Sequence, residues 1–148
     1  MKITTSRFGE LDIDKSREIN FAEGILGFAK YHAYVLLDHD AHKPFKWLQS
    51  IENGELAFVV TDPLTVIPDY TAAVSKQDVD AIQLDSLEKA VVLCIVTIGK
   101  GCSSVTANLV APIIINPDAM LAKQVILYDS PYSIKHDLIR LPKKANAE

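Results

Sequence analysis

Short β-type runs separated by turn residues recur along the whole chain, and this spacing limits the folds that the chain can adopt. About nine or ten such runs follow one another at intervals of roughly 8–12 residues, which is typical of an antiparallel sandwich or barrel. The sequence shows no β-α-β alternation, internal repeat or interdomain linker. We therefore predict a mainly β fold, a small antiparallel β-barrel or sandwich with one or two short helices.

Two hairpins are the clearest local elements. Residues 2–5 and 10–13 alternate polar and apolar side chains around a turn that contains glycine. Asn53 and Gly54 divide residues 45–61 into two β-type runs, and Asn-Gly between such runs is the strongest short-range hairpin signal. Both segments are therefore predicted as antiparallel hairpins.

The remaining elements follow from shorter patterns. Gly24 and Gly27, close together, indicate backbone positions that need positive φ or close packing. Residues 75–82 fit a short helix, because Ser75 can accept a bond from a free first-turn N–H and acidic residues suit a helix start. Further strands are predicted at 18–21, 33–38, 70–75, 90–98, 104–110, 111–116 and 123–128.

Length and composition favour one globular domain. The 148 residues are 49% hydrophobic, enough for a buried core, and we assign residues 1–140 to one domain and 141–148 to a disordered tail. No apolar run approaches the roughly 18–20 residues of a transmembrane helix, and the first residues lack the apolar region of a signal peptide. We therefore expect a cytoplasmic protein with reduced cysteines.

Charge is distributed unevenly along the chain. The formal net charge of −4 argues against a binder of nucleic acid, which needs cationic groups to neutralise phosphates. Residues 1–88 carry a net charge of −7, whereas residues 89–148 carry +3. An acidic half can steer a basic protein partner, although surface carboxylates often form only a solvated face.

The candidate catalytic and metal-binding residues form no complete set. Cys94 lies in an apolar run, where desolvation opposes thiolate formation. The histidines between residues 32 and 42 match no known metal-ligand spacing, so we expect no metal and no cofactor. Cys102 and His136 leave one enzymatic alternative, a small cytosolic hydrolase with a Cys/His-based site.

The segment 62–70 is unusually apolar for a loop and is framed by two prolines. It can form a protein-binding patch, or its apolar side chains can plug the end of the barrel. For the first case, we hypothesise that it forms a partner surface with two carboxylates of the neighbouring hairpin. The residues assigned to this surface are Glu52, Glu55, Asp62, Leu64, Ile67 and Tyr70.

Residues 111–116 suggest a second partner surface. Pro112 cannot donate to a ladder of hydrogen bonds, so this run is predicted as an edge strand. An exposed edge can recruit an extended partner segment, and we assign Pro112 and Asn116 to this contact.

Four sequence blocks, in order, resemble the family of the flagellar assembly factor FliW. The blocks are Phe21–Phe28, Leu48–Glu52 leading through 56–60 to Asp62-Pro63, Thr106–Asn116, and Lys123–Leu127 followed by Tyr132 and His136. The departures are small: Leu26 stands where members often have proline, and Lys135 where they often have arginine. The resemblance covers about residues 1–140.

The resemblance implies a cytoplasmic binding protein with a small antiparallel β-barrel fold, not an enzyme. It implies two partners: flagellin, and the RNA-binding translational repressor CsrA, which silences the flagellin message. The family is described as capturing CsrA when free of flagellin and as acting beside the RNA site. We also expect a monomer when free, with no direct contact to nucleic acid or membrane.

Overall fold

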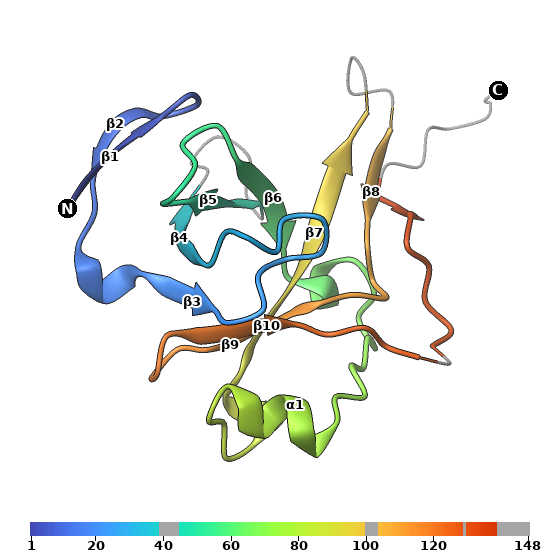
Figure 1. Cartoon of the computed structure of the whole chain (residues 1–148). Helices are drawn as coiled ribbons and strands as arrows, with labels where there is room; N and C mark the ends of the chain where they lie inside the picture. Colours follow the sequence, from blue (N-terminus) through green and yellow to red (C-terminus); the bar gives the residue numbers. More distant parts are fainter. Residues whose placement is uncertain (39–44, 100–103, 129, 139–148) are drawn as a thin grey trace, which may run out of the picture.

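Strands make up most of the regular structure in the residues that the computed structural model describes, which are 1–38, 45–99, 104–128 and 130–138 (Figure 1). They are β1 (Lys2–Thr5), β2 (Gly9–Asp12), β3 (Ile19–Phe21), β4 (Ala33–Asp38), β5 (Lys46–Ser50), β6 (Ala57–Thr61), β7 (Val91–Ile98), β8 (Val105–Ala107), β9 (Ile113–Asn116), β10 (Leu121–Gln124) and β11 (His136–Asp137). The helices are α1 (Lys76–Ala81) and the single 3-10 turns η1 (Lys15–Arg17), η2 (Pro63–Thr65) and η3 (Leu87–Lys89).

Seven of these strands close into a barrel. They lie in the order β7, β6, β5, β4, β3, β10 and β9, and β9 pairs back onto β7. Neighbours are antiparallel except β3 and β10, which are parallel. Beside β9 on the same edge of β7 lies β8, which also pairs with β11. The predicted mainly β fold, a small barrel with few short helices, is confirmed.

The barrel interior is filled from every barrel strand. Successive side chains of a strand face opposite sides of a sheet, so alternate residues point inward. The buried interior residues are Ile19, Phe21, Ile25, Tyr34, Leu48, Val60, Leu93, Ile113, Ile115 and Ala122. Ile25 comes from the connection between β3 and β4, so this connection adds a buried side chain to the interior.

That connection depends on glycine. Gly24 has a φ of +69°, and an added Cβ would lie 2.7 Å from the backbone of Ala29. Gly27 also has positive φ. The prediction from the two glycines is therefore confirmed, and at Gly24 both positive φ and close packing apply.

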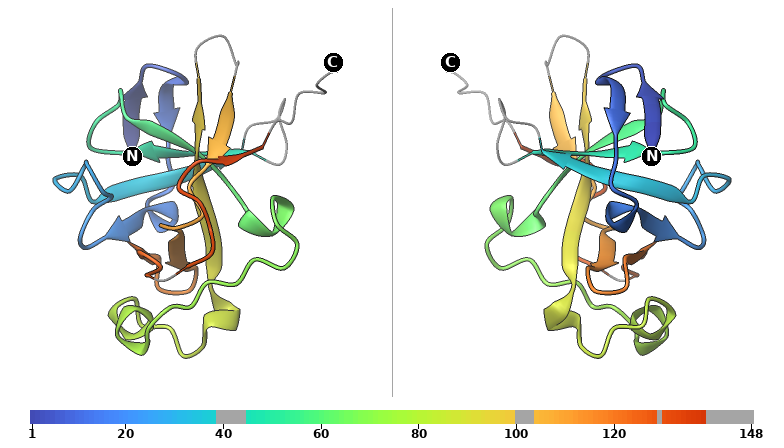
Figure 2. Two further views of the ribbon diagram at one scale, coloured as in Figure 1. Left: turned by 90° about the vertical axis from the view of Figure 1, so that its right-hand side faces the viewer. Right: turned by 90° about the vertical axis from the view of Figure 1, so that its left-hand side faces the viewer.

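A second apolar core lies outside the barrel, on the outer face of β7, β8 and β9. The long connection from β6 to β7, residues 62–90, covers this face and carries α1 (Figures 1 and 2). Leu93 points into the barrel, whereas its neighbour Cys94 points into this outer core. The buried outer-core residues are Tyr70, Ile82, Leu84, Cys94, Val96, Val105, Ala107, Leu109, Ile114, Val125 and Leu127.

The N-terminal hairpin of β1 and β2 forms a separate small sheet that packs against the β5–β6 hairpin. Phe8 contacts Trp47 edge to face at a ring-centroid distance of 5.7 Å. The Ser6 amide donates to the carbonyl of Gly54 at 3.0 Å. A Cβ on Gly54 would collide with the Thr4 carbonyl, so this glycine is required by the approach of another chain segment.

Several local predictions are confirmed. The two predicted hairpins are β1–β2 and β5–β6, with Gln49 opposite Ala57 at the end of the second. The predicted helix is α1, where the Ser75 hydroxyl accepts from the Asp78 amide at 3.2 Å.

One strand prediction is wrong, and a second holds only at its start. Residues 70–75 form no strand, because the Val74 amide closes a local turn onto the Ala72 carbonyl at 3.0 Å. The run predicted at 123–128 is strand only to Gln124. The amides of Val125 and Leu127 still donate to the carbonyls of Pro112 and Val110, which precede β9. The predicted tail at 141–148 lies outside the described residues.

Candidate functional site

The proline-framed connection after β6 begins with a capped turn. The Asp62 carboxylate accepts from the Leu64 amide at 2.9 Å, and the Asp62 carbonyl accepts from the Thr65 amide at 3.0 Å. Pro63, the first residue of η2, is buried. This turn holds Leu64 in solvent, with 52% of its surface exposed.

Most of the same connection packs on the outer core, and not at the end of the barrel as the alternative prediction had it. Val66 and Ile67 pack against the outer core. Tyr70 is buried, its hydroxyl donates to the Leu109 carbonyl at 2.8 Å, and its ring lies 4.5 Å from that of Tyr132. Burial raises the pKa of Tyr70 above its ordinary value. The Tyr70 side chain is thus held inside the fold, although the residue also lines the groove described below, and its assignment to a partner surface stays a prediction.

Glu52 and Glu55 do not lie beside this connection. They belong to the β5–β6 turn, whereas Asp62 follows the opposite end of β6. At roughly 3.3 Å per residue, the strand between them separates the two places by more than about 13 Å. The predicted surface is therefore two separate places, and this part of the hypothesis is wrong.

The Glu52 side chain has a structural role of its own. Its carboxylate accepts from the backbone amides of His32 and Ala33, at 2.9 Å for Ala33. These backbone hydrogen bonds hold the Glu52 pKa below its usual value. Glu52 thus fixes the start of β4 on the β5–β6 turn.

The edge-strand prediction for residues 111–116 is also wrong. Strand β9 pairs with β10 on one side and with β7 on the other, and all four of its residues are buried. Pro112 precedes the strand, and its carbonyl accepts from the Val125 amide at 2.9 Å. Pro112 therefore interrupts no ladder, and strand addition to β9 has no structural basis.

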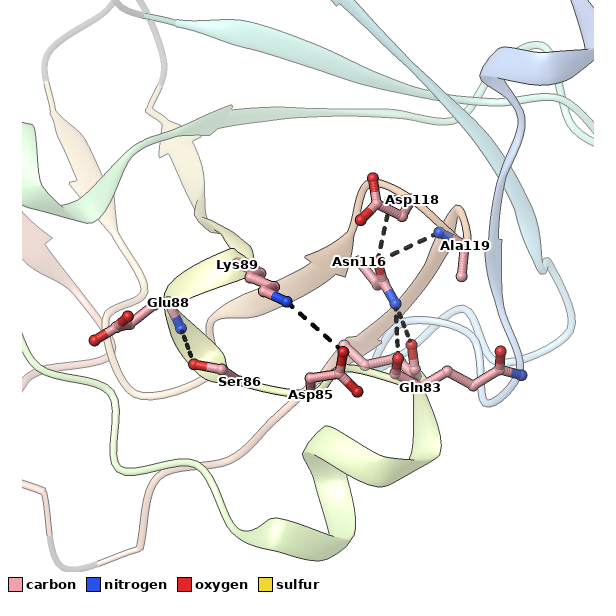
Figure 3. Close-up of polar contacts among 9 residues, drawn as sticks. Gln83, Asp85, Ser86, Glu88, Lys89, Asn116, Asp118 and Ala119 are labelled. Carbon is pink, nitrogen blue, oxygen red and sulfur yellow. Dashed lines mark hydrogen bonds and ion pairs between the residues drawn. The ribbon is translucent and has the colours of Figure 1, made fainter.

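Asn116 is a buried connector between two turns (Figure 3). Its side-chain amide donates to the carbonyls of Ile82 and Gln83 at 2.9 and 3.1 Å. Its side-chain oxygen accepts from the amides of Asp118 and Ala119 at 3.0 and 3.3 Å. These four bonds account for Asn116 without a partner protein.

A groove of about 650 Å³ lies between η2 and the start of β7. Its lining includes three of the residues assigned to the partner surface, Asp62, Leu64 and Tyr70, together with residues that the sequence did not indicate. Those additional residues include Ala72, Leu87, Glu88, Ala90, Val91 and Val92. Val91 is exposed over 39% of its surface, so two large apolar side chains meet solvent in one groove.

The rim of this groove is acidic. Asp62 and Glu88 form no ion pair with any residue in the described ranges. Lys46 also lines the groove, but its ammonium is paired with the Asp38 carboxylate at 3.2 Å. An apolar floor with unpaired carboxylates suits a partner that is apolar and basic.

The described residues give the hydrolase alternative no support. Cys94 is fully buried, its thiol donates to the Thr61 carbonyl at 3.5 Å, and desolvation raises its pKa to about 12. His136 pairs with Ala107 and lines a different hollow of about 550 Å³. Cys102 lies outside the described residues.

The histidine loop is only partly described. His32 lies with its ring Nδ1 2.9 Å from the Phe21 carbonyl, a structural contact. His39 and His42 lie outside the described residues. Within the part of the chain that the structure describes, no three His, Cys, Asp or Glu side chains converge as a metal site would require. No helix among these residues is long and apolar enough to span a membrane.

Comparison with known proteins gives one consistent result. The family model described as "FliW protein" matches residues 2–138. The flagellar assembly factor FliW of Natranaerobius thermophilus is 42% identical over 139 residues, covering 93% of this chain and 92% of that protein. The FliW of Geotalea uraniireducens is 37% identical over 144 residues, covering 97% and 88%.

The structural comparison agrees. A crystal structure of the flagellar assembly factor FliW superimposes with a TM-score of 0.89 at 32% sequence identity. The match covers 96% of this chain and 99% of that one. The similarity thus extends over nearly the whole length of both chains.

Proposed function

The chain belongs to the FliW family of flagellar assembly factors, and we propose that it binds flagellin in the cytoplasm and, when free of flagellin, binds and antagonises the repressor CsrA. The observation that carries this proposal is the groove between η2 and β7, in which the exposed side chains of Leu64 and Val91 lie beside an acidic rim. Apolar side chains left in solvent beside unpaired carboxylates are typical of a protein-binding surface.

Competition between the two partners follows from mass action. If both bind at overlapping or coupled surfaces, flagellin that accumulates before export occupies the protein and leaves CsrA free to repress. Export of flagellin frees the protein to capture CsrA. The coupling needs no catalysis, only two mutually exclusive complexes.

Charge supports CsrA as one of the two partners. CsrA is basic where it holds RNA, and the first 88 residues of this chain carry a net charge of −7. Complementary charge speeds association and orients the partner. We further propose that this charge steers the encounter, whereas the final contact lies beside the RNA site of CsrA, so that RNA loss follows from coupling between two surfaces.

Binding to purified flagellin and CsrA, measured by isothermal titration calorimetry, tests the proposal. We expect both partners to bind the wild-type chain and flagellin to displace CsrA. Glu88→Lys is expected to weaken at least one complex about fivefold or more, because it reverses a charge on the groove rim. The matched control is Glu55→Lys, which reverses an exposed charge at the far end of β6 and is expected to bind normally.

Whether the protein binds CsrA beside its RNA site or within that site needs a separate assay. A gel shift of labelled message with CsrA is expected to lose the RNA complex as this protein is added, and no shift is expected with this protein alone. A CsrA variant that cannot bind RNA should still bind this protein. Absence of both flagellin and CsrA binding by a folded chain would refute the proposed function.

A further inference from the structure

Strand β7 has an unpaired stretch at its beginning. Strand β7 runs over Val91–Ile98, but β6 pairs only with its middle, ending where Thr61 lies opposite Cys94. Beyond Thr61 the chain turns away through Asp62 and Pro63 into η2. The β6 side of residues 91–93 therefore has no neighbouring strand.

The direction of the backbone groups follows from alternation in an antiparallel strand. The Ile95 carbonyl accepts from the Asn108 amide at 2.9 Å, and the Gly99 amide donates to the Ser104 carbonyl at 2.7 Å. Odd-numbered residues of β7 thus face β8 and β9, and even-numbered residues face β6. Val92 is the even-numbered residue beyond the end of β6, so its N–H and C=O point into the groove.

These two groups are not used by the described fold. Val92 lies opposite Ile114 of β9, but the same alternation makes this a pair without hydrogen bonds. Among the described residues, no backbone bond outside the ladders reaches Val92 either. Backbone polar groups beside apolar walls favour pairing with another backbone. The groove thus presents one donor and one acceptor at the spacing of a strand, beside the apolar Leu64, Leu87 and Val91.

We propose that the groove binds an extended segment of a partner protein by strand addition, antiparallel to β7 and in line with β6. The segment pairs with Val92 through its backbone and places alternate apolar side chains against the groove walls. Lys or Arg residues flank these side chains and face Asp62 and Glu88, which have no ion pair within the described residues. The acidic rim selects a basic segment over an acidic one.

The segment belongs to flagellin or CsrA if the proposed function holds. The partners can also bind without strand addition, so the two proposals can be tested separately. Residue-resolved amide exchange by NMR separates these outcomes. In the free protein we expect fast exchange at Val92 and slow exchange at Val91 and Leu93, whose backbones face β9. In a complex with either partner, Val92 exchange is expected to slow by about tenfold or more.

A short peptide that alternates Val and Thr between pairs of Lys gives an assay without either natural partner. We expect a fluorescein-labelled form to bind, and the same peptide with alternate backbone amides N-methylated to lose about tenfold or more in affinity. Glu in place of the Lys residues is expected to weaken binding by a similar factor.

Two variants test the protein side. Val92→Pro removes the amide that faces the groove without removing a donor to β9, and is expected to abolish peptide binding. Glu88→Lys keeps the backbone and is expected to weaken the Lys-flanked peptide about fivefold. Partner complexes that form while Val92 exchange stays fast would overturn strand addition and leave the proposed function intact. Equal binding of the N-methylated peptide would also overturn it.

Discussion

The barrel interior and the outer core bury similar kinds of side chain but are organised differently. In the interior, all seven barrel strands contribute alternate residues, and backbone ladders fix where each points. In the outer core, an irregular connection supplies many of the side chains, and individual polar groups fix its course. Tyr70 bonds to Leu109, and Asn116 bonds to Ile82 and Gln83.

This difference explains where the groove lies. A closed ladder leaves no backbone group free, whereas a connection that departs from β6 at Pro63 leaves the beginning of β7 without a neighbour. The barrel, which we call the regular layer, therefore gives stability. The connection 62–90, the irregular layer, provides a place for a partner.

The largest expected effect is in the barrel interior. Phe21→Ala removes a fully buried ring that packs edge to face on Tyr34 at 5.2 Å, and should lower the free energy of unfolding by about 3–5 kcal/mol in urea titrations. Phe8→Ala is the matched control, since Phe8 contacts Trp47 on the partly exposed hairpin and should cost clearly less. Equal losses for the two variants would contradict the difference in burial.

A smaller effect, but one on both stability and binding, is expected in the outer core. Asn116→Ala leaves the buried carbonyl of Ile82 without its donor and should cost about 1–3 kcal/mol. Because the connection from residue 82 leads to the groove, partner affinity should also fall, whereas folded Phe21→Ala should bind normally. Asn116→Asp keeps the acceptor for Asp118 and Ala119 but puts a buried carboxylate oxygen against the carbonyls of Ile82 and Gln83, so unfolding should show a loss at least as large as for Asn116→Ala.

The sequence predicted the regular layer well, for a physical reason. Period-2 alternation and turn residues are local signals, and they indicated the two hairpins. Aromatic, β-branched and continuous apolar runs are local too, and they indicated the strands at 33–38 and 90–98. Asn53-Gly54 indicated its hairpin correctly. The structure requires glycine at position 54 because the backbone of Thr4 approaches it closely.

The candidate site was predicted only in part. Asp62, Leu64 and Tyr70 line the groove, but the Tyr70 hydroxyl and the Asn116 side chain bond inward. Nothing local in the sequence distinguishes a polar side chain that bonds inward from one that meets a partner. Closure of the barrel is a long-range property, so the edge prediction for residues 111–116 could not be tested from the run itself. One signal in the sequence could have indicated the groove. The β6 run ends before Pro63 and is shorter than the run at 90–98 with which it pairs, so part of the longer run is left without a neighbour.

Removal of the Tyr70 hydroxyl is a more subtle test of the outer core. Tyr70→Phe keeps the ring against Tyr132 but leaves the buried Leu109 carbonyl without its donor, which should cost about 1 kcal/mol and lower the midpoint of thermal unfolding. Tyr132→Phe removes a hydroxyl that accepts from the exposed Thr71 amide, where water can substitute, so its effect should be smaller. If Tyr70→Phe were neutral, packing alone would hold the connection.

The smallest effect concerns the ion pair that ties α1 to the barrel. The Lys123 ammonium donates to the Asp78 carboxylate at 2.7 Å, both side chains are partly buried, and this bond lowers the pKa of Asp78. A pKa lowered in the folded state means that the pair stabilises the fold above the ordinary Asp pKa of about 3.9 and loses this effect as the pH falls through the folded value. Asp78→Asn should therefore cost roughly 1 kcal/mol at pH 7 and progressively less below pH 4.

The exposed pair of Lys76 and Asp80 provides the contrast for this pH profile. Its two charges lie 2.8 Å apart but in solvent, so Asp80→Asn should leave the stability unchanged across the same pH range. Urea unfolding of wild type and both variants between pH 3 and 8 measures the difference directly. A cost for Asp78→Asn that stays constant down to pH 3 would show that shape, not charge, holds α1 on β10, and the outer core would then resemble the barrel interior in this respect.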